Sequence, residues 1–185
     1  MNNQSEELTN GMIQSFTRRG LLKQFCAGLA GLVLALTSLV PSAVQAESEV
    51  PFRANWETQI SIAPLEPPLF VVSGLGAGKA LHLGDMTAQS ITEVVNLATG
   101  EGAASYRFTA ANGDDVLITF AFLAIPTSPT AFSIEGVWQV TGGTGRFEGA
   151  SGSGTYIGHA EFVGPADAVG AFALEGTISS PNQLW

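Results

Sequence analysis

From residue 56 onwards, large apolar residues recur at every second position in short runs. Positions between them are mostly polar, among them Arg107, Thr119 and Glu175. A period of two is typical of a β-strand with one buried and one solvated face. No window keeps an apolar period of 3.6 residues over a dozen positions. The pattern therefore predicts an all-β protein. It is clearest at Tyr106 and Phe108; Val116, Ile118, Phe120 and Phe122; Phe132, Ile134, Trp138 and Val140; Tyr156 and Phe162; and Phe172, Leu174 and Ile178.

The runs predict candidate strands separated by short segments rich in turn residues. The clearest separator is Ala111-Asn112-Gly113-Asp114, whose Asn-Gly pair allows the positive φ of a tight hairpin. Eight or nine such strands must close into a barrel or stack as a sandwich to bury the apolar face. We predict a single closed antiparallel barrel of about eight strands, filled by side chains or holding one small ligand. The candidate strands are 56–62, 69–72, 79–83, 91–97, 105–110, 115–123, 130–140, 155–163 and 170–178.

Alternating strands are also found in outer-membrane barrels, where the apolar face contacts lipid and the interior is polar. Two features oppose that alternative here. The predicted strands are mostly shorter than the ~9–11 residues of a spanning strand, and Pro181 separates the terminal Trp185 from the last predicted strand. We therefore favour a soluble barrel with an apolar interior.

The first 46 residues have the features of an export leader. Arg18 and Arg19 lie in a polar segment that ends at Lys23 and Gln24, and an uncharged stretch follows from Phe25, as in signals of the twin-arginine type. The apolar part, residues 25–36, has twelve residues, whereas a helix needs ~20 to cross a bilayer. Val44 and Ala46 supply the small residues that a signal peptidase accepts at the −3 and −1 positions, and we place the cut before Glu47. The sequence thus predicts a twin-arginine-type signal peptide over residues 1–46 and a periplasmic or extracellular protein.

Removal of the leader leaves an acidic chain without cysteine. The leader holds three of the seven basic residues, two of the sixteen acidic residues and the only cysteine, Cys26. The predicted β-barrel domain, residues 47–185, keeps four basic and fourteen acidic residues, a formal charge of −10. The carboxylates are scattered, which indicates a solvated acidic surface and argues against a nucleic-acid partner. Without disulfides, stability must come from the core. We expect no membrane span in this domain and leave a homo-oligomer open.

The densest local motif is the glycine-rich stretch from Thr141 to Gly152. A phosphate-binding loop would need a Lys-Ser/Thr pair after the glycines and a helix after the loop, and the sequence predicts neither. Ser151 also lacks the Gly-x-Ser-x-Gly context of a nucleophile elbow. The glycines therefore predict a tight connection with positive φ angles, with Phe147 packed beneath it.

Part of this stretch resembles a known family. Gly142-Gly143-Thr144-Gly145-Arg146-Phe147 followed by Ala150-Ser151-Gly152 is similar to the corresponding loop of the allene oxide cyclase and dirigent superfamily. The segments 78–84 and 110–114 resemble a group of secreted bacterial proteins that share this loop. The resemblance implies a lipocalin-like barrel of eight strands, whose relatives bind small hydrophobic molecules and steer cyclisations or couplings. It carries over no catalytic residue, because the matched positions are mostly glycines and turn residues.

Five aromatic residues on the predicted inner face are candidates for ligand binding: Tyr106, Phe120, Phe132, Trp138 and Tyr156. A buried tyrosine hydroxyl needs a partner and could orient a ligand. The alternative is a filled core in which each hydroxyl bonds to the backbone. The function we predict first is an exported barrel that binds a small hydrophobic ligand in its interior or mouth.

Two other functions remain open. One is a cofactor-independent cyclase or isomerase, which needs an ionisable group inside the barrel. Glu135 and Glu161 would have to point inward for this, against the predicted register, so the catalytic residues are unknown. The other is a structural or adhesive envelope protein without a pocket.

The two histidines give the sequence a candidate metal-binding pattern. His82 is followed by Asp85, and His159 is followed by Glu161. Two histidines and a carboxylate can form an iron-type facial triad, but the sequence does not bring the two histidines together. We expect neither a metal nor another cofactor.

Overall fold

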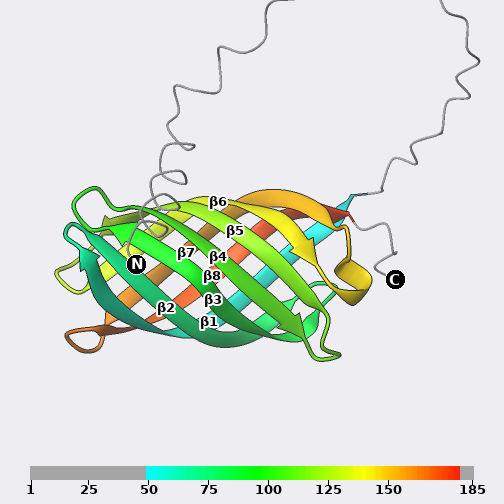
Figure 1. Ribbon diagram of the computed structural model, residues 1–185, viewed down its shortest axis with the longest axis horizontal. Helices are drawn as coiled ribbons and strands as arrows, with labels where there is room; N and C mark the ends of the chain where they lie inside the picture. The colour runs from blue at the N-terminus through cyan, green and yellow to red at the C-terminus, as the bar shows by residue number, and fades with distance from the viewer. Residues whose placement is uncertain (1–48, 180–185) are drawn as a thin grey trace, which may run out of the picture. The chain divides into compact units, whose positions relative to one another are not determined.

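The computed structural model describes residues 49–179, which form a closed barrel of eight strands (Figure 1). Each strand pairs antiparallel with the next one along the chain, and β8 pairs with β1 to close the sheet. This confirms the predicted fold class. The predicted leader lies outside the described residues. The elements are β1 (Val50–Glu66), β2 (Leu69–Ala80), β3 (Gly84–Asn96), β4 (Glu101–Ala110), β5 (Asp115–Pro126), β6 (Ala131–Gly143), the short 3-10 helix η1 (Gly145–Phe147), β7 (Ser151–Phe162) and β8 (Asp167–Ser179).

The prediction of two separate strands at 69–72 and 79–83 was wrong. These segments belong to one continuous strand, β2, and its following turn. The glycines between them suggested a turn, but in the barrel they lie opposite bulky residues of β1. Gly78 is paired with Trp56, and a Cβ at Gly78 would lie 2.7 Å from the Trp56 Cβ. Glycine is used here for a close approach within a strand rather than for a turn.

The strands are also longer than predicted, at 10 to 17 residues. Strand length therefore gives no reason to prefer one type of barrel. The inner positions of the strands are occupied mainly by apolar side chains. In β1 these include Phe52, Ala54, Trp56 and Ile60, which are all buried. Among the described residues, no helix is long and apolar enough to cross a membrane.

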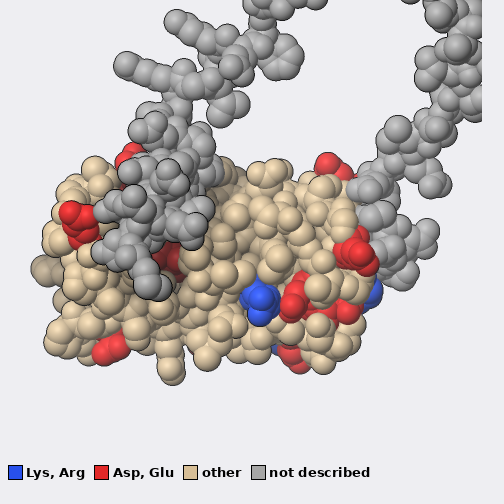
Figure 2. Space-filling model, viewed as in Figure 1, with Lys and Arg blue, Asp and Glu red and all other residues tan. Residues whose placement is uncertain are grey.

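The outer surface carries most of the charged residues. Figure 2 shows acidic side chains dispersed over the visible face and few basic ones among them. Glu135 and Glu161 are exposed on the outer side of β6 and β7, as the predicted register required. The alternation of the sequence therefore gives the correct orientation for these two strands.

The two ends of the barrel differ. The loops β2–β3, β4–β5 and β6–β7 surround what we call the closed end, and the four other loops surround the open end. At the closed end the glycine-rich loop folds over the barrel with Phe147 completely buried beneath it. Gly145 and Gly149 have φ angles of 57° and 73°, which confirms the predicted use of glycine in this connection. Arg146 joins the loop to the β4–β5 turn through Asp114, at 2.9 Å.

Candidate functional site: a cavity at the open end

A cavity of about 70 Å³ lies inside the open end of the barrel. That volume is enough for a few water molecules or for the head of a larger molecule that projects from the mouth. Its walls are mainly apolar, and the inward-facing exceptions are Glu93 and the hydroxyl of Tyr156, while Glu161 borders the mouth with its side chain on the outer side of β7. The lining residues are Ile60, Ile62, Val72, Glu93, Val95, Leu97, Phe122, Ala124, Phe132, Ile134, Tyr156, Ala160, Glu161, Phe162, Ala168 and Phe172.

An irregularity in β3 directs Glu93 into the barrel. The register between β3 and β4 shifts between Ser90 and Thr92, so two consecutive residues, Ile91 and Thr92, face outward. Ile91 is 51% exposed although it is apolar. The inward hydroxyl of Ser90 accepts a hydrogen bond of 2.6 Å from the Gly74 amide. After this bulge the alternation resumes with Glu93 and Val95 on the inner face.

The Glu93 carboxyl group is held by a tyrosine inside the barrel. Tyr106 of β4 donates its hydroxyl hydrogen to Glu93 Oε2 at 2.7 Å. Gly74 leaves space for this hydroxyl, because a Cβ at Gly74 would lie 2.8 Å from Tyr106 Oη. The pair is thus built from three adjacent strands, β2, β3 and β4.

Burial controls the protonation of this group. The apolar surroundings of the partly buried Glu93 raise its pKa from 4.5 to about 7, although the Tyr106 hydrogen bond acts in the opposite direction. Burial, together with the nearby Glu93 carboxylate, also raises the pKa of Tyr106 and of Tyr156. Both tyrosines are therefore neutral hydrogen-bonding groups near neutral pH, while Glu93 exchanges a proton in that range.

Stacked aromatic rings close the bottom of the cavity. Tyr156 and Phe172 line it, with ring centroids 5.7 Å apart and planes 21° from parallel. Trp56 stacks on Tyr156 at 6.1 Å and on Phe172 at 5.4 Å. The Trp56 indole nitrogen is buried and has no hydrogen-bond partner in the part of the chain that the structure describes. Between these rings and the closed end, the barrel is filled by side chains.

The five predicted ligand-binding residues have different positions and roles in the structure. Phe132 and Tyr156 line the cavity. Tyr106 holds Glu93, and Phe120 packs between the two tyrosines, with ring centroids 5.7 Å from Tyr106 and 4.8 Å from Tyr156. Trp138 is a core residue of the closed half. Its indole nitrogen donates to a backbone carbonyl of β8 at 3.2 Å.

Sequence reasoning missed Glu93. A partial signal was present, because Glu93, Val95 and Leu97 occupy every second position of a predicted strand, although Ile91, two residues earlier, faces outward at the bulge. Applied strictly, that alternation puts Glu93 on the apolar face. The predicted cyclase alternative required an ionisable group inside the barrel, and the structure has one at Glu93 rather than at Glu135 or Glu161.

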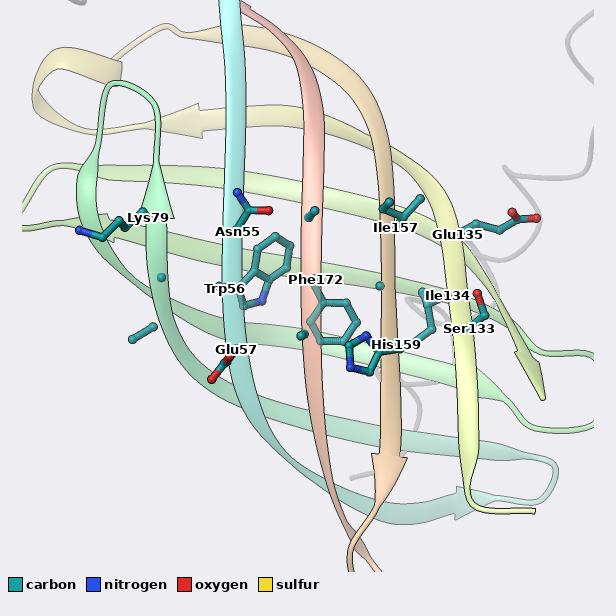
Figure 3. Close-up of a pocket in the computed structure, with 15 residues that line it drawn as sticks. Asn55, Trp56, Glu57, Lys79, Ser133, Ile134, Glu135, Ile157, His159 and Phe172 are labelled. Carbon is teal, nitrogen blue, oxygen red and sulfur yellow. The ribbon is translucent and has the colours of Figure 1, made fainter. Parts of the chain in front are cut away.

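A second concavity lies on the outside of the barrel. This outer depression, about 830 Å³ and widely open, covers the wall from β2 across β1, β8 and β7 to β6. Figure 3 shows Lys79, Asn55 and Glu135 along it, with Trp56 and Phe172 side by side in the wall. Small residues on β8 leave it hollow. The Lys79 amine is already paired with a carboxylate, Asp85, at 2.7 Å. The polar side chains of the outer depression are thus exposed to solvent, whereas the carboxyl group of Glu93 lies inside the barrel.

The two histidines do not share a site. His82 is in the β2–β3 turn at the closed end, where its Nε2 lies 3.1 Å from the Pro51 carbonyl oxygen. His159 is on the outer face of β7, at the outer depression. Residues 49–179 contain no group of three or more side chains that could hold a metal ion.

The fold and site together define an antiparallel eight-stranded barrel with an acidic group in an apolar cavity. No family model matches the sequence, and no curated protein matches it either. Among solved structures, a pterocarpan synthase dirigent protein is similar, with 13% sequence identity over 75% of this chain and 90% of the other. The TM-score is 0.39, so the barrel assignment rests on the strand pairings described above.

Proposed function

We propose that this protein binds a small, mainly apolar molecule whose head enters the cavity at the open end. The observation that carries the proposal is a mainly apolar cavity, open at the mouth, with one hydrogen-bonding carboxyl group, the usual composition of a small-molecule site. The cavity is small, so the rest of the ligand lies at the mouth, against residues such as Phe132 and Phe162. The resemblance to the allene oxide cyclase and dirigent superfamily is compatible with such a ligand.

Two matched substitutions test the location. Ala160 lines the cavity, whereas Ala171, on the neighbouring strand, lines the outer depression. Binding of a neutral fluorescent probe, N-phenyl-1-naphthylamine, is followed by titration. We expect Ala160→Leu to weaken binding at least tenfold, because the added atoms fill the cavity, and Ala171→Leu to change it less than twofold. The reverse result would assign binding to the outer depression, and no binding by the unmodified protein would contradict the proposal.

A cyclase or isomerase is a second candidate, and Glu93 is the observation that favours it. A carboxyl group with a pKa of about 7 can give and take a proton at neutral pH. In that role Glu93 would act as acid or base on an enclosed substrate, with Tyr106 as the residue that positions it. Substitution Glu93→Gln would then abolish turnover and leave substrate binding within a few fold.

We also propose that the chain works outside the cytoplasm after removal of residues 1–46. The support is the order of paired arginines, a short apolar stretch and small residues at the cut. The N-terminal residue of the protein recovered from its final location tests this, and Glu47 is expected.

A further inference from the structure

The charge balance around the cavity restricts the chemistry of its ligand. The described part of the chain has four basic side chains, and each one is in an ion pair with a carboxylate other than Glu93. Glu93 therefore has no cationic partner among residues 49–179. The pairs are Arg53 with Glu175 at 3.2 Å, Lys79 with Asp85 at 2.7 Å, Arg107 with Asp115 at 3.6 Å, and Arg146 with Asp114 at 2.9 Å.

The carboxyl group also has an oxygen left for a ligand. Glu93 Oε2 accepts the hydrogen bond from Tyr106. The other oxygen, Oε1, has no hydrogen-bond partner among the described residues, and Glu93 lines the cavity. A carboxylate in apolar surroundings is costly unless a positive charge or further donors accompany it. Glu93 Oε1 is therefore a hydrogen-bond acceptor for which the described residues supply no donor.

The aromatic rings at the cavity favour a donor that carries a positive charge. The faces of aromatic rings attract cations, and Phe122, Tyr156 and Phe172 contribute rings to the walls. An anionic head, such as that of a fatty acid, would meet the Glu93 carboxylate and no basic side chain among the residues that line the cavity.

We propose that the ligand is an amphipathic amine whose protonated nitrogen binds Glu93 and whose apolar body extends through the open end. This inference rests on the proposed binding function and specifies its ligand class. The ammonium group supplies the counter-charge that no described side chain provides, and it donates to Oε1. An uncharged alcohol can occupy the same space but brings no charge.

A set of three ligands with the same chain tests the inference: octylamine, 1-octanol and octanoate, each titrated against the purified protein at pH 8. We expect octylamine to bind at least tenfold more tightly than octanol, and octanoate more weakly than octanol. In the variant Glu93→Gln, octylamine should bind within threefold of octanol, with octanol affinity preserved. Glu161→Gln is the matched control at the mouth and should weaken octylamine binding at most about threefold.

Titrations of the unmodified protein with octylamine and octanol at several pH values test the same inference without a variant. Tyr106 and Tyr156 face Glu93 from β4 and β7, and both stay neutral because their pKa values are raised. Glu161 also borders the open end, but its side chain is exposed on the outer side of β7. The preference for octylamine over octanol should therefore increase from pH 6 to pH 8 as Glu93 ionises.

Two kinds of failure can be told apart. The ligand class is wrong if octanol or octanoate binds as tightly as octylamine, or if Glu93→Gln keeps the preference for the amine. If neither the neutral probe nor octanol nor octylamine binds, the proposed function itself fails.

Discussion

The closed and the open end of this barrel are built from the same alternating strands, yet only one of them leaves space inside. At the closed end, Phe52 and Trp138 pack edge to face at 5.7 Å, and Phe147 from the glycine-rich loop lies beneath that loop. At the open end, the inner positions include the small residues Ala160 and Ala168. Small inner residues also occur in the closed half, such as Ala88 and Ala110. The difference therefore lies in the loop that covers the closed end with Phe147, not in the strand pattern.

The two ends also differ in how their polar groups are paired. Groups at the closed end are mutually satisfied, as in the Asp114–Arg146 pair and in the hydrogen bond from the Asp115 amide to Thr144 Oγ1 at 2.9 Å. At the open end, Glu93 has a hydrogen bond from Tyr106 but no ion pair among the described residues. The closed end contributes mainly to the stability of the barrel, and the open end is where the proposed ligand would bind.

The largest effect should come from removing the side chain packed under the loop at the closed end. Phe147→Ala is expected to lower the free energy of unfolding by about 3–5 kcal/mol, because it leaves a cavity in a fully buried position. Phe132→Ala, at the partly exposed mouth, should cost about 1 kcal/mol. Urea unfolding of both variants measures the difference. Equal losses would contradict the functional division between the ends.

A smaller effect should appear in the pH dependence of stability. The folded-state pKa of Glu93, about 7, is higher than the value of 4.5 expected when the chain is unfolded. The folded protein therefore binds the extra proton between these values, so stabilisation is complete below about pH 4.5 and is lost as pH rises through 7. We expect a loss of roughly 1–3 kcal/mol between about pH 5 and pH 8.

The variant Glu93→Gln should lack this decline because it has no proton to lose. Glu161→Gln, which changes an exposed carboxylate, should keep it. Urea unfolding at several pH values, compared as differences from the unmodified protein, separates Glu93 from the other carboxylates. A decline of the same size in the unmodified protein and in Glu93→Gln would show that another group is responsible.

The smallest effect should distinguish the two tyrosines. At pH 8, Tyr106→Phe removes the donor to Glu93 and should cost about 1–2 kcal/mol. Tyr156→Phe removes a hydroxyl that makes no hydrogen bond within residues 49–179, and should change stability by at most about 0.5 kcal/mol. Thermal unfolding of the two variants is sufficient to compare them. The opposite order would mean that Tyr156, not Tyr106, holds the carboxyl group.

Features that depend on a few neighbouring residues could be predicted, and features that depend on pairing between strands could not. The hairpin at Asn112-Gly113 belongs to the first kind because four consecutive residues determine its geometry, and Gly113 has the expected positive φ of 89°. The continuity of β2 belongs to the second. It depends on Trp56 of another strand, for which Gly78 leaves space. Glycine by itself does not distinguish a turn from a close approach.

The sequence by itself determined the class of fold, since the alternation of apolar and polar residues is a consequence of strand geometry and acts over a few residues. It also determined the acidic surface and the orientation of Glu135 and Glu161. Only the tertiary structure decided where the cavity lies, because empty space is what remains after eight strands have contributed their side chains. It also decided the role of Glu93, since the bulge at Ser90–Thr92 and the hydroxyl of Tyr106 come together only when β3 pairs with β4.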